Sequence, residues 1–319
     1  MVRGLDGALA PVENPESLYR SVPEIGTIAE IDILPLTNID STNLQPGLWS
    51  RISKAIFERM EKYDGFVVTH GTDTLSYTAV AISFMLRNLE KPVVVTGAQV
   101  PLGEIGSDGR DNLVNAIRVA MEDLAEVVVV FGTQIIRGTR AKKTSAFHLQ
   151  AFTSANEHPI GQIGLSIKIS DGARKRGRRE TILDTNIESA VAIVPVYPGM
   201  KPDIITYLAS THAGLVIEGY GAGLIPTEGQ SLVPAIREAV GRGVPVVVCT
   251  QCLLGSTEME LYQVGRAALD AGAIPAMDMT PEATLVKLMW ILGQTRDMKT
   301  VEKMMLKPFA GELHEPNQH

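Results

Sequence analysis

The chain has 319 residues, of which 45% are hydrophobic, and it carries a formal net charge of −7 with a pI near 5.5. This length exceeds what one hydrophobic core usually supports, so we expect two domains, and the negative charge argues against a nucleic-acid surface as the main function. The longest apolar runs, at 127–130 and 244–249, are much shorter than the roughly 20 residues of a membrane span, which predicts a cytoplasmic protein with no membrane partner.

The first half of the chain alternates between patterns typical of strands and of helices. Runs of β-branched and aromatic residues predict strands, and apolar residues at helical spacing predict helices. The predicted strands span 28–34, 64–69, 92–96 and 126–131, and the predicted helices span 48–62, 75–89 and 111–122. This alternation is typical of a mainly parallel sheet with helices on both faces.

The alternation restarts after a polar, basic segment at 170–188. Strands are expected at 190–196, 214–221 and 244–250, and helices near 202–210, 231–241 and 281–293, the last with Thr280 as N-cap and Pro281 at its first position. We therefore predict an α/β fold with two α/β domains in series: a larger N-terminal parallel-sheet domain over 1–172, a linker over 173–188, and a smaller C-terminal flavodoxin-like domain over 189–319. The basic run ARKRGRR at 173–179 lies in this linker, where we expect a solvated loop rather than a contact for a polyanion.

The two cysteines of the chain, Cys249 and Cys252, form the sequence CTQC. A structural zinc site needs about four ligands, usually from two such pairs, and no second pair or nearby histidine motif is present. Two buried thiols in a reducing compartment are the simpler interpretation. We expect no metal and no other cofactor.

Residues 66–78 read FVVTHGTDTLSYT, and they place polar side chains between a predicted strand and a predicted helix. The polar residues are Thr69, His70, Thr72 and Asp73. In open α/β sheets, ligands bind beyond the carboxyl ends of the strands, and a helix N-terminus there favours anionic groups. This turn is therefore in the right position for a binding site.

A threonine hydroxyl becomes a good nucleophile only when a base removes its proton. His70 is close in sequence to Thr72, but a histidine at a strand end more often bonds to backbone carbonyls. A lysine is the other option, and the segment RGTRAKKTSAF offers Lys142 and Lys143, although adjacent lysines are usually solvated. The residue pattern alone leaves the base open. It contains no nucleophile elbow, P-loop, dinucleotide-binding or zinc-protease motif.

Several segments, in the same order, resemble the bacterial-type L-asparaginase and glutaminase family. They are THGTDT at 69–74 together with NIDST at 38–42, KPVVVTGAQVPL at 91–102, RGTRAKKTSAFHLQAF at 137–152, EGYGAG at 218–223 and GAIPAMDMTPEATLVKLMWILG at 272–293. The resemblance covers nearly the whole chain and is strongest to the cytoplasmic, type I-like branch. It implies hydrolysis of L-asparagine to L-aspartate and ammonia through an acyl-threonine intermediate.

The resemblance also implies roles for particular residues. Thr72 corresponds to a catalytic threonine, Lys143 to the lysine that serves it as base, and Asp73 to the acid that binds the substrate α-amino group. The remaining substrate contacts it implies are Ser41, with Asp40 before it, for the α-carboxylate, and the main chain of Ala98 for the side-chain amide. No cofactor is implied, the substrate is the small-molecule partner, and a homodimer or homotetramer is expected.

The chain departs from the family pattern at its beginning. Family members start with an apolar strand that runs into TGGTIA, whose threonine is the usual acylating nucleophile, and a tyrosine follows on the next loop. Neither is found here, where MVRGLDGALAP opens the chain. The segment GTIA at 26–29 copies part of the motif, but we reject Thr27 as a substitute because it runs directly into the strand predicted at 28–34.

Two explanations follow from this departure: a gene whose true start lies upstream, which we favour, or a relative without catalysis. We expect an L-asparaginase-type amidohydrolase with reduced or absent activity in the chain as it stands. The alternative is a non-catalytic asparaginase-like protein that binds an amino acid or acts as a scaffold. A third interpretation is the asparaginase-like component of the archaeal amidotransferase that forms Gln-tRNA. It is less favoured because that component carries an additional N-terminal domain.

Overall fold

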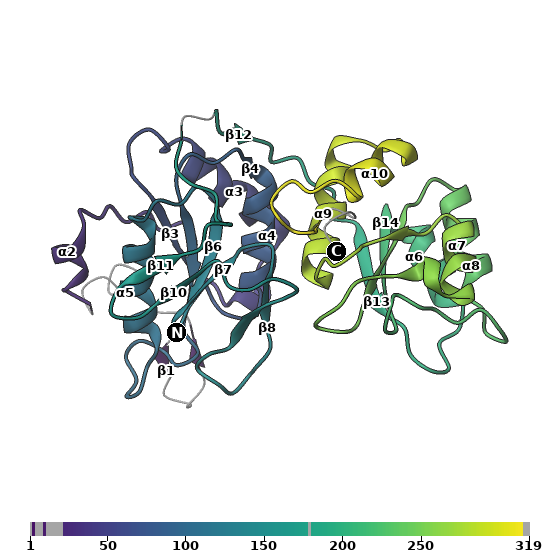
Figure 1. Cartoon of the computed structure of the whole chain (residues 1–319), viewed down its shortest axis with the longest axis horizontal. Helices are drawn as coiled ribbons and strands as arrows, with labels where there is room; N and C mark the ends of the chain where they lie inside the picture. Colours follow the sequence, from purple (N-terminus) through teal and green to yellow (C-terminus); the bar gives the residue numbers. More distant parts are fainter. Residues whose placement is uncertain (1, 4–8, 11–21, 178–179, 315–319) are drawn as a thin grey trace. The chain divides into compact units, whose positions relative to one another are not determined.

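The computed structural model describes residues 2–3, 9–10, 22–177 and 180–314, and Figure 1 shows its helices and strands. The chain divides into two compact units, Met1–Thr185 and Asn186–His319. The first unit extends to Thr185 because β12 (Ile182–Leu183) pairs antiparallel with β4 (Leu86–Arg87). The exact limits of the linker predicted at 173–188 stay a prediction.

A sheet whose described strands follow the order β11-β10-β7-β6-β5-β3 forms the centre of the first unit. Its strands are β3 (Phe66–Thr69), β5 (Val93–Thr96), β6 (Val127–Phe131), β7 (Gln134–Arg137), β10 (Gly161–Ile163) and β11 (Ile167–Ile169). The predicted parallel pairing holds for β3, β5 and β6. The rest of the sheet is antiparallel, because a two-residue turn after Phe131 returns the chain directly into β7 and Gly132 supplies its positive φ of 58°.

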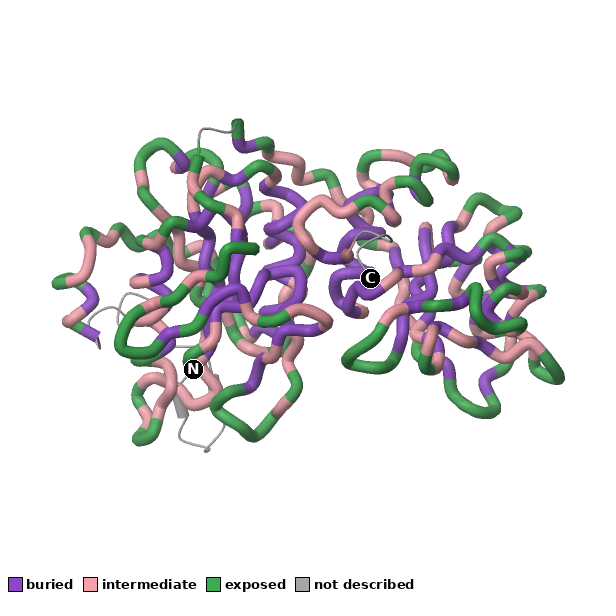
Figure 2. Tube along the Cα trace, in the orientation of Figure 1, coloured by how far each residue is buried: buried purple, intermediate pink, exposed green. Residues whose placement is uncertain are grey.

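Helices cover both faces of this sheet. The helices α3 (Pro46–Phe57) and α4 (Leu75–Met85) lie on one face, and α5 (Gly109–Ala120) lies on the other. The strand side chains alternate accordingly: Val93 and Val95 pack in the core under α4, whereas Val94 packs under α5. The buried segments in Figure 2 follow these central strands and the inner sides of the helices.

The remaining elements of the first unit are short. They are α2 (Ile25–Ile28), the 3-10 helix η1 (Ser41–Asn43), the paired strands β1 (Val2–Arg3) and β2 (Leu9–Ala10), and the paired strands β8 (Ala141–Lys143) and β9 (Phe152–Ser154).

The strand predicted at 28–34 is wrong. Residues 25–28 form α2, and the chain from 29 to 40 is irregular, with Ile33 and Leu34 exposed. A strand needs a neighbour for its backbone hydrogen bonds, and among the described residues this segment has none. Among the described residues, β3 is an edge strand of the sheet and pairs only with β5.

The basic run predicted as a solvated loop is irregular over residues 173–177, and residues 178 and 179 lie outside the described residues. The prediction is wrong for the side chain of Arg176, which bonds to the protein instead of water. Arg176 donates hydrogen bonds to the carbonyl oxygens of Glu122 (2.8 Å), Asp64 (2.7 Å) and Ala120 (3.0 Å). The carbonyl of Arg174 accepts from the backbone N–H of Ala125 at 2.8 Å. A guanidinium can satisfy several orphan carbonyls at once, so this part of the run fixes the end of α5 to the segment that follows the sheet.

The second unit is built on a parallel sheet of β13 (Val191–Pro195), β14 (Gly214–Gly219), β15 (Val246–Thr250) and β16 (Ile274–Pro275). These strands lie in chain order, whereas a flavodoxin-like sheet has a reversal of strand order. The parallel α/β architecture is therefore confirmed, but the flavodoxin-like order is not observed. The surrounding helices are α6 (Asp203–Thr211), α7 (Val233–Gly241), η2 (Met259–Leu261), α8 (Gln263–Asp270), α9 (Pro281–Gln294) and α10 (Met298–Met305).

Two details of the second unit bear on the sequence predictions. Thr280 caps α9 as predicted, since its side chain accepts from the backbone N–H of Ala283, and Pro281 opens the helix. The prediction that both thiols are buried is wrong for Cys252. Cys249 is buried in β15, but that strand ends at Thr250, so Cys252 lies in the exposed segment that follows.

Candidate active site

The turn between β3 and α4 carries the residues singled out by sequence, and His70 holds its backbone. The Nδ1 of His70 lies 2.7 Å from the carbonyl oxygen of Gly71, which can only accept, so Nδ1 carries the proton. Nε2 then accepts from the Thr78 hydroxyl (2.9 Å), and that hydroxyl accepts from the indole N–H of Trp49 (3.0 Å). Burial lowers the pKa of His70, with a smaller opposing effect of the Gly71 carbonyl. The predicted structural role of His70 is confirmed.

A second turn, TGAQ after β5, lies directly against the first. A Cβ on Gly97 would be 2.2 Å from the carbonyl oxygen of His70, so glycine is required for this approach. The side chain of Asn112 donates to the carbonyl of Gly97 at 2.9 Å, and the Asp108 carboxylate accepts from the backbone N–H groups of Gln99 and Val100. The start of α5 therefore fixes the second turn.

Lys143, on β8, reaches two polar residues of the first turn, Thr72 and Asp73. Its Nζ lies 2.8 Å from Thr72 Oγ1 and 2.7 Å from Asp73 Oδ1. The Lys143 side chain is 22% exposed and that of Asp73 is 57% exposed, so the ion pair opens to solvent on the Asp73 side. Because side chains alternate along a strand, Lys142 points to the opposite face of β8. The structure thus brings Thr72, Asp73 and Lys143 together.

Ser41 lies on the other side of the same turn. Ser41 is buried, and a Cβ on Gly71 would lie 2.6 Å from the hydroxyl oxygen of Ser41. The Thr74 hydroxyl donates to the backbone carbonyl of Ser41 at 2.8 Å, which ties η1 to the start of α4. The Asp40 carboxylate accepts from the backbone N–H (2.9 Å) and the hydroxyl (2.8 Å) of Thr42, and these bonds lower its pKa. Asp40 therefore caps η1 and keeps Ser41 in place.

Both halves of the chain match family models. Residues 1–174 match "Asparaginase, N-terminal", and residues 190–305 match "Glutaminase/Asparaginase C-terminal domain". The chain belongs to the asparaginase family. It is 38% identical to L-asparaginase 1 of Escherichia coli strain K12 over 294 residues, which cover 91% of this chain and 86% of that protein.

Two further comparisons define how far the family likeness extends. The solved structure of the thermostable L-asparaginase from Thermococcus kodakarensis is similar over 98% of this chain and 95% of that one, with a TM-score of 0.89 and 38% identity. One component of the glutamyl-tRNA(Gln) amidotransferase of Pyrococcus furiosus is 42% identical over 319 residues, which cover 96% of this chain and 72% of that protein. The asparaginase architecture therefore spans both units of the chain.

Two sequence predictions about the site concern residues outside the cluster. Thr27 lies exposed in α2, and its hydroxyl donates to the carbonyl of Glu24 at 2.7 Å. Rejecting Thr27 agrees with this placement, although the reason given, a strand at 28–34, is wrong. The segment GALAP at 7–11, which stands where the family has a tyrosine, lies largely outside the described residues.

One side chain at the site was missed by sequence reasoning. Gln99 follows Ala98 in the second turn, and its Oε1 accepts from the Thr72 hydroxyl at 3.0 Å. Ala98 itself packs against the first residue of α5, with its Cβ 3.1 Å from where a Cβ on Gly109 would lie. The glutamine stood inside the motif that identified Ala98, but nothing in the sequence indicated that it reaches Thr72.

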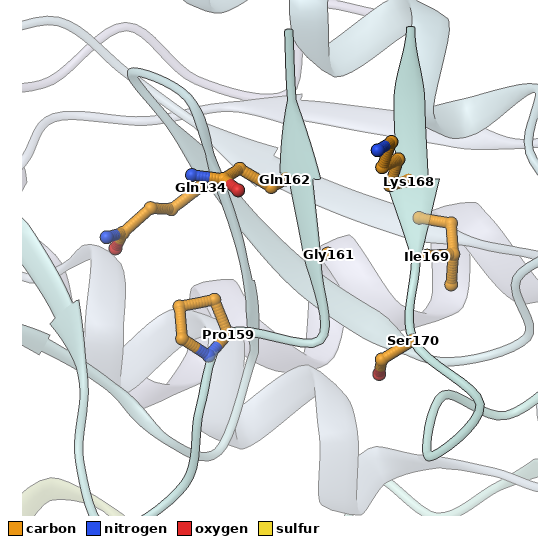
Figure 3. Close-up of a pocket in the computed structure, with 7 residues that line it drawn as sticks. All are labelled: Gln134, Pro159, Gly161, Gln162, Lys168, Ile169 and Ser170. Atoms are coloured by element: carbon orange, nitrogen blue, oxygen red, sulfur yellow. The ribbon is translucent and has the colours of Figure 1, made fainter.

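A separate cavity of about 400 Å³ lies on the antiparallel part of the sheet (Figure 3). Figure 3 shows that its lining comes from β7, β10, β11 and the segments around them, and none of these residues belongs to the Thr72 cluster. The described residues contain no group of three or more His, Cys, Asp or Glu side chains arranged to hold a metal ion. No helix in the described ranges is both long enough and apolar enough to cross a membrane.

Proposed function

We propose that the protein is an L-asparaginase-type amidohydrolase that releases ammonia from L-asparagine, with Thr72 as the attacking hydroxyl of this chain. One observation carries the proposal: the Nζ of Lys143 lies 2.8 Å from Thr72 Oγ1. A threonine hydroxyl needs an adjacent base to attack an amide, and Lys143 is a base within hydrogen-bond reach. The similarity to L-asparaginases over most of the chain supports the choice of substrate.

In the proposed reaction, Lys143 first gives up one proton to solvent and keeps its hydrogen bond to Asp73 Oδ1. Thr72 Oγ1 then attacks the side-chain amide carbon of L-asparagine while the Lys143 amine takes the hydroxyl proton. The new C–O bond forms, the C–N bond breaks, and Lys143 returns the proton to the leaving ammonia. Water then hydrolyses the acyl-threonine ester to give L-aspartate. We assign the main chain of Ala98 to contact the substrate amide, and the close approach of the two turns at Gly97 supports this assignment.

The charges around the turn suit an amino acid. Lys143 occupies Oδ1 of Asp73, which leaves Oδ2 of this half-exposed carboxylate for the substrate α-ammonium group. We assign the Ser41 hydroxyl, which lies beside Gly71, to donate to the α-carboxylate, and the N-terminus of α4 would add a favourable field for that anion. No metal or other cofactor enters the proposal.

Residues 1–319 do not contain the TGGTIA segment that carries the usual acylating threonine of the family. We therefore expect slower turnover than in a relative with both threonines. The same site also fits the alternative of a non-catalytic protein that binds L-asparagine or L-aspartate. The alternative makes no use of the Lys143–Thr72 contact, which is why we favour hydrolysis.

A second enzymatic candidate follows from the 42% identity to a component of the glutamyl-tRNA(Gln) amidotransferase of Pyrococcus furiosus. In that role the released ammonia would serve to amidate glutamyl-tRNA(Gln) rather than leave as product. Formation of Gln-tRNA in a mixture that contains the chain, charged tRNA and the remaining amidotransferase components would favour this candidate over free hydrolysis.

We further propose a cytoplasmic homodimer or homotetramer. The C-terminal unit exposes apolar side chains on the segment after β15, with Leu254 64% and Leu261 71% exposed. Large exposed apolar side chains supply surface for contacts between copies of the chain. Light scattering tests the assembly: a mass of two or four chains supports it, and a monomer at micromolar concentration contradicts it.

The test of function measures ammonia release from L-asparagine by residues 1–319 and by Thr72→Val and Lys143→Met. The proposal predicts release that falls on the order of 100-fold or more in both variants, with melting temperatures near wild type. If the chain releases no ammonia but L-aspartate raises its melting temperature, and Asp73→Asn removes that shift, the binding alternative is correct. If neither is seen, both assignments fail.

A further inference from the structure

The side chain of Gln99 joins three separate segments of the first unit. Its Oε1 accepts from Thr72 Oγ1 at 3.0 Å, and its Nε2 donates to the carbonyl oxygens of Ser145 (3.4 Å) and His148 (3.3 Å). Its backbone N–H is held by the Asp108 carboxylate at 3.0 Å. One amide therefore contacts the turn after β3 and the loop after β8 from a position on the turn after β5.

The orientation of this amide follows from its partners. The two carbonyl oxygens of Ser145 and His148 can only accept, so they require the NH₂ end of the glutamine. The carbonyl end must then face Thr72, because the reversed amide would bring two pairs of oxygen atoms together. The Thr72 hydroxyl has a single proton, and Oε1 can only accept, so that proton points toward Gln99.

This geometry determines which partner holds the proton of Thr72. Lys143 Nζ also lies 2.8 Å from Thr72 Oγ1, but on the other side it donates to Asp73 Oδ1 at 2.7 Å. In the arrangement described, Lys143 donates to a lone pair of Thr72, and the hydroxyl proton is directed to Gln99. For Lys143 to act as a base, the hydroxyl must turn from Gln99 toward the lysine.

We propose that Gln99 is a positioning residue that sets the direction of the Thr72 hydroxyl and couples it to the loop at 144–150. This inference rests on the proposed role of Thr72 in amide hydrolysis. The loop directly follows Lys143, and it is closed on itself by the Ser145 hydroxyl, which accepts from the backbone N–H groups of Phe147 (3.0 Å) and His148 (2.8 Å). When the carbonyls of this loop shift, the amide shifts with them, and Thr72 is released to Lys143.

The loop is placed to respond to a substrate. Phe147 is 87% exposed, and residues 146–150 are all exposed, whereas the turns that carry Thr72 and Gln99 are fixed by α5 and by His70. A ligand that contacts the loop would thus act on the Thr72 hydroxyl through one hydrogen-bonded side chain. The conformation of the loop would then contribute to the specificity of the site for its substrate.

Two variants test this role: one removes both ends of the amide, and the other changes only its donor end. Gln99→Met keeps the length of the side chain but removes the acceptor and the donor. Gln99→Glu keeps an acceptor toward Thr72 but, when ionised, turns an oxygen toward the two carbonyls. The matched control is Gln162→Met, an exposed glutamine on β10.

Steady-state ammonia release from L-asparagine is measured for each variant from about pH 5.5 to pH 8. Gln99→Met is expected to lower kcat by about 10- to 100-fold and to change KM less than about threefold, because Thr72 loses the partner that fixes its side chain in the attacking rotamer, while the substrate contacts stay. The ratio of Gln99→Glu to wild-type kcat is expected to rise as pH falls, since a protonated carboxyl again accepts from Thr72 and donates to a carbonyl. The ratio for Gln99→Met stays flat, because the neighbouring ionisable groups, Asp108, Lys143, Asp73 and His148, are the same in every variant.

A double-mutant cycle of melting temperatures tests the hydrogen bond between Thr72 and Gln99 without any turnover. Thr72→Val and Gln99→Met remove the same hydrogen bond, so the shift in melting temperature of the double variant should be smaller than the sum of the single shifts. A wild-type kcat in Gln99→Met, a flat ratio for Gln99→Glu, or additive shifts would each overturn the inference. If the wild-type chain releases no ammonia, the proposed function fails, and the double-mutant cycle still decides whether Gln99 holds Thr72.

Discussion

Replacing Gly97 by alanine tests whether the two turns of the site must touch. The added Cβ would lie 2.2 Å from the carbonyl oxygen of His70, whereas ordinary contact begins at 3.4 Å, so the turns must separate by about 1.2 Å. The opposing atom is backbone, and a change of rotamer cannot relieve the clash. Because Thr72 and Gln99 each come two residues after the clashing residues His70 and Gly97, the separation acts on the distance between them.

Gly97→Ala is expected to lower both the stability of the protein and its kcat/KM. Overpacking of this kind destabilises by about 1–3 kcal/mol, and a displacement on the order of 1 Å between reacting groups lowers kcat/KM by about 100-fold. Chemical denaturation measures the first and ammonia release from L-asparagine measures the second. The matched control is Gly103→Ala in the following loop, where a Cβ meets no atom within 4 Å and φ is not positive.

Gly103→Ala should stay within about 0.5 kcal/mol of the wild-type stability and close to its kcat/KM. The reasoning is refuted if Gly97→Ala matches this control in both measurements, because the turns would then tolerate separation. A loss of stability with unchanged kcat/KM would refute the coupling of the turns to catalysis alone.

Two predictions concern buried ionisable groups. His70 has a lowered pKa when folded, so the unfolded chain binds a proton that the folded chain does not. Stability that is present above about pH 6.5 is therefore lost as pH falls below it. The melting temperature of His70→Gln should fall less than that of wild type between pH 7.5 and pH 5.5, and parallel curves would contradict this. Lys287 and Glu312 form a buried ion pair at 2.6 Å with both side chains 0% exposed, so Lys287→Met should cost about 3–5 kcal/mol by leaving a buried carboxylate without its cation. The exposed pair of Arg242 and Glu238 is its control, since Arg242→Met should cost less than about 1 kcal/mol in the same denaturation assay.

Two of the strands that were predicted correctly are buried on both faces. The run Val93–Thr96 has all four residues buried, and the run Val127–Phe131 has all five. Continuous β-branched sequence between helices is enough to indicate such a strand, because its packing needs apolar side chains on every residue. The capped start of α9 was predictable for a similar reason, since Thr280 and Pro281 act on their own helix end.

The failures concern segments whose structure depends on a distant partner. Residues 28–34 have strand-like composition, but a strand also needs a paired neighbour, and the described chain supplies none. The run around Arg176 has the composition of a solvated loop, but the Arg176 guanidinium donates to three carbonyl oxygens more than 50 positions earlier in the chain. Neither outcome can be predicted from the local sequence.

The site was predictable in position and only partly in detail. The turn at Thr72 follows from the strand-to-helix pattern, but Lys143 was distinguished from Lys142 only by a family resemblance. The alternation of β8 supplies the physical reason, because only one of two adjacent residues can face the turn. Gln99 was missed since its role depends on contacts with residues 27, 46 and 49 positions away.

The central claim is that Thr72, served by Lys143, attacks the amide of L-asparagine. The most direct measurement is ammonia release by residues 1–319 compared with Thr72→Val, which keeps the shape of the side chain and removes its hydroxyl. The account predicts release that saturates with L-asparagine in the wild-type chain and falls on the order of 100-fold or more in the variant, which remains folded at the assay temperature. Equal release by both proteins would contradict it.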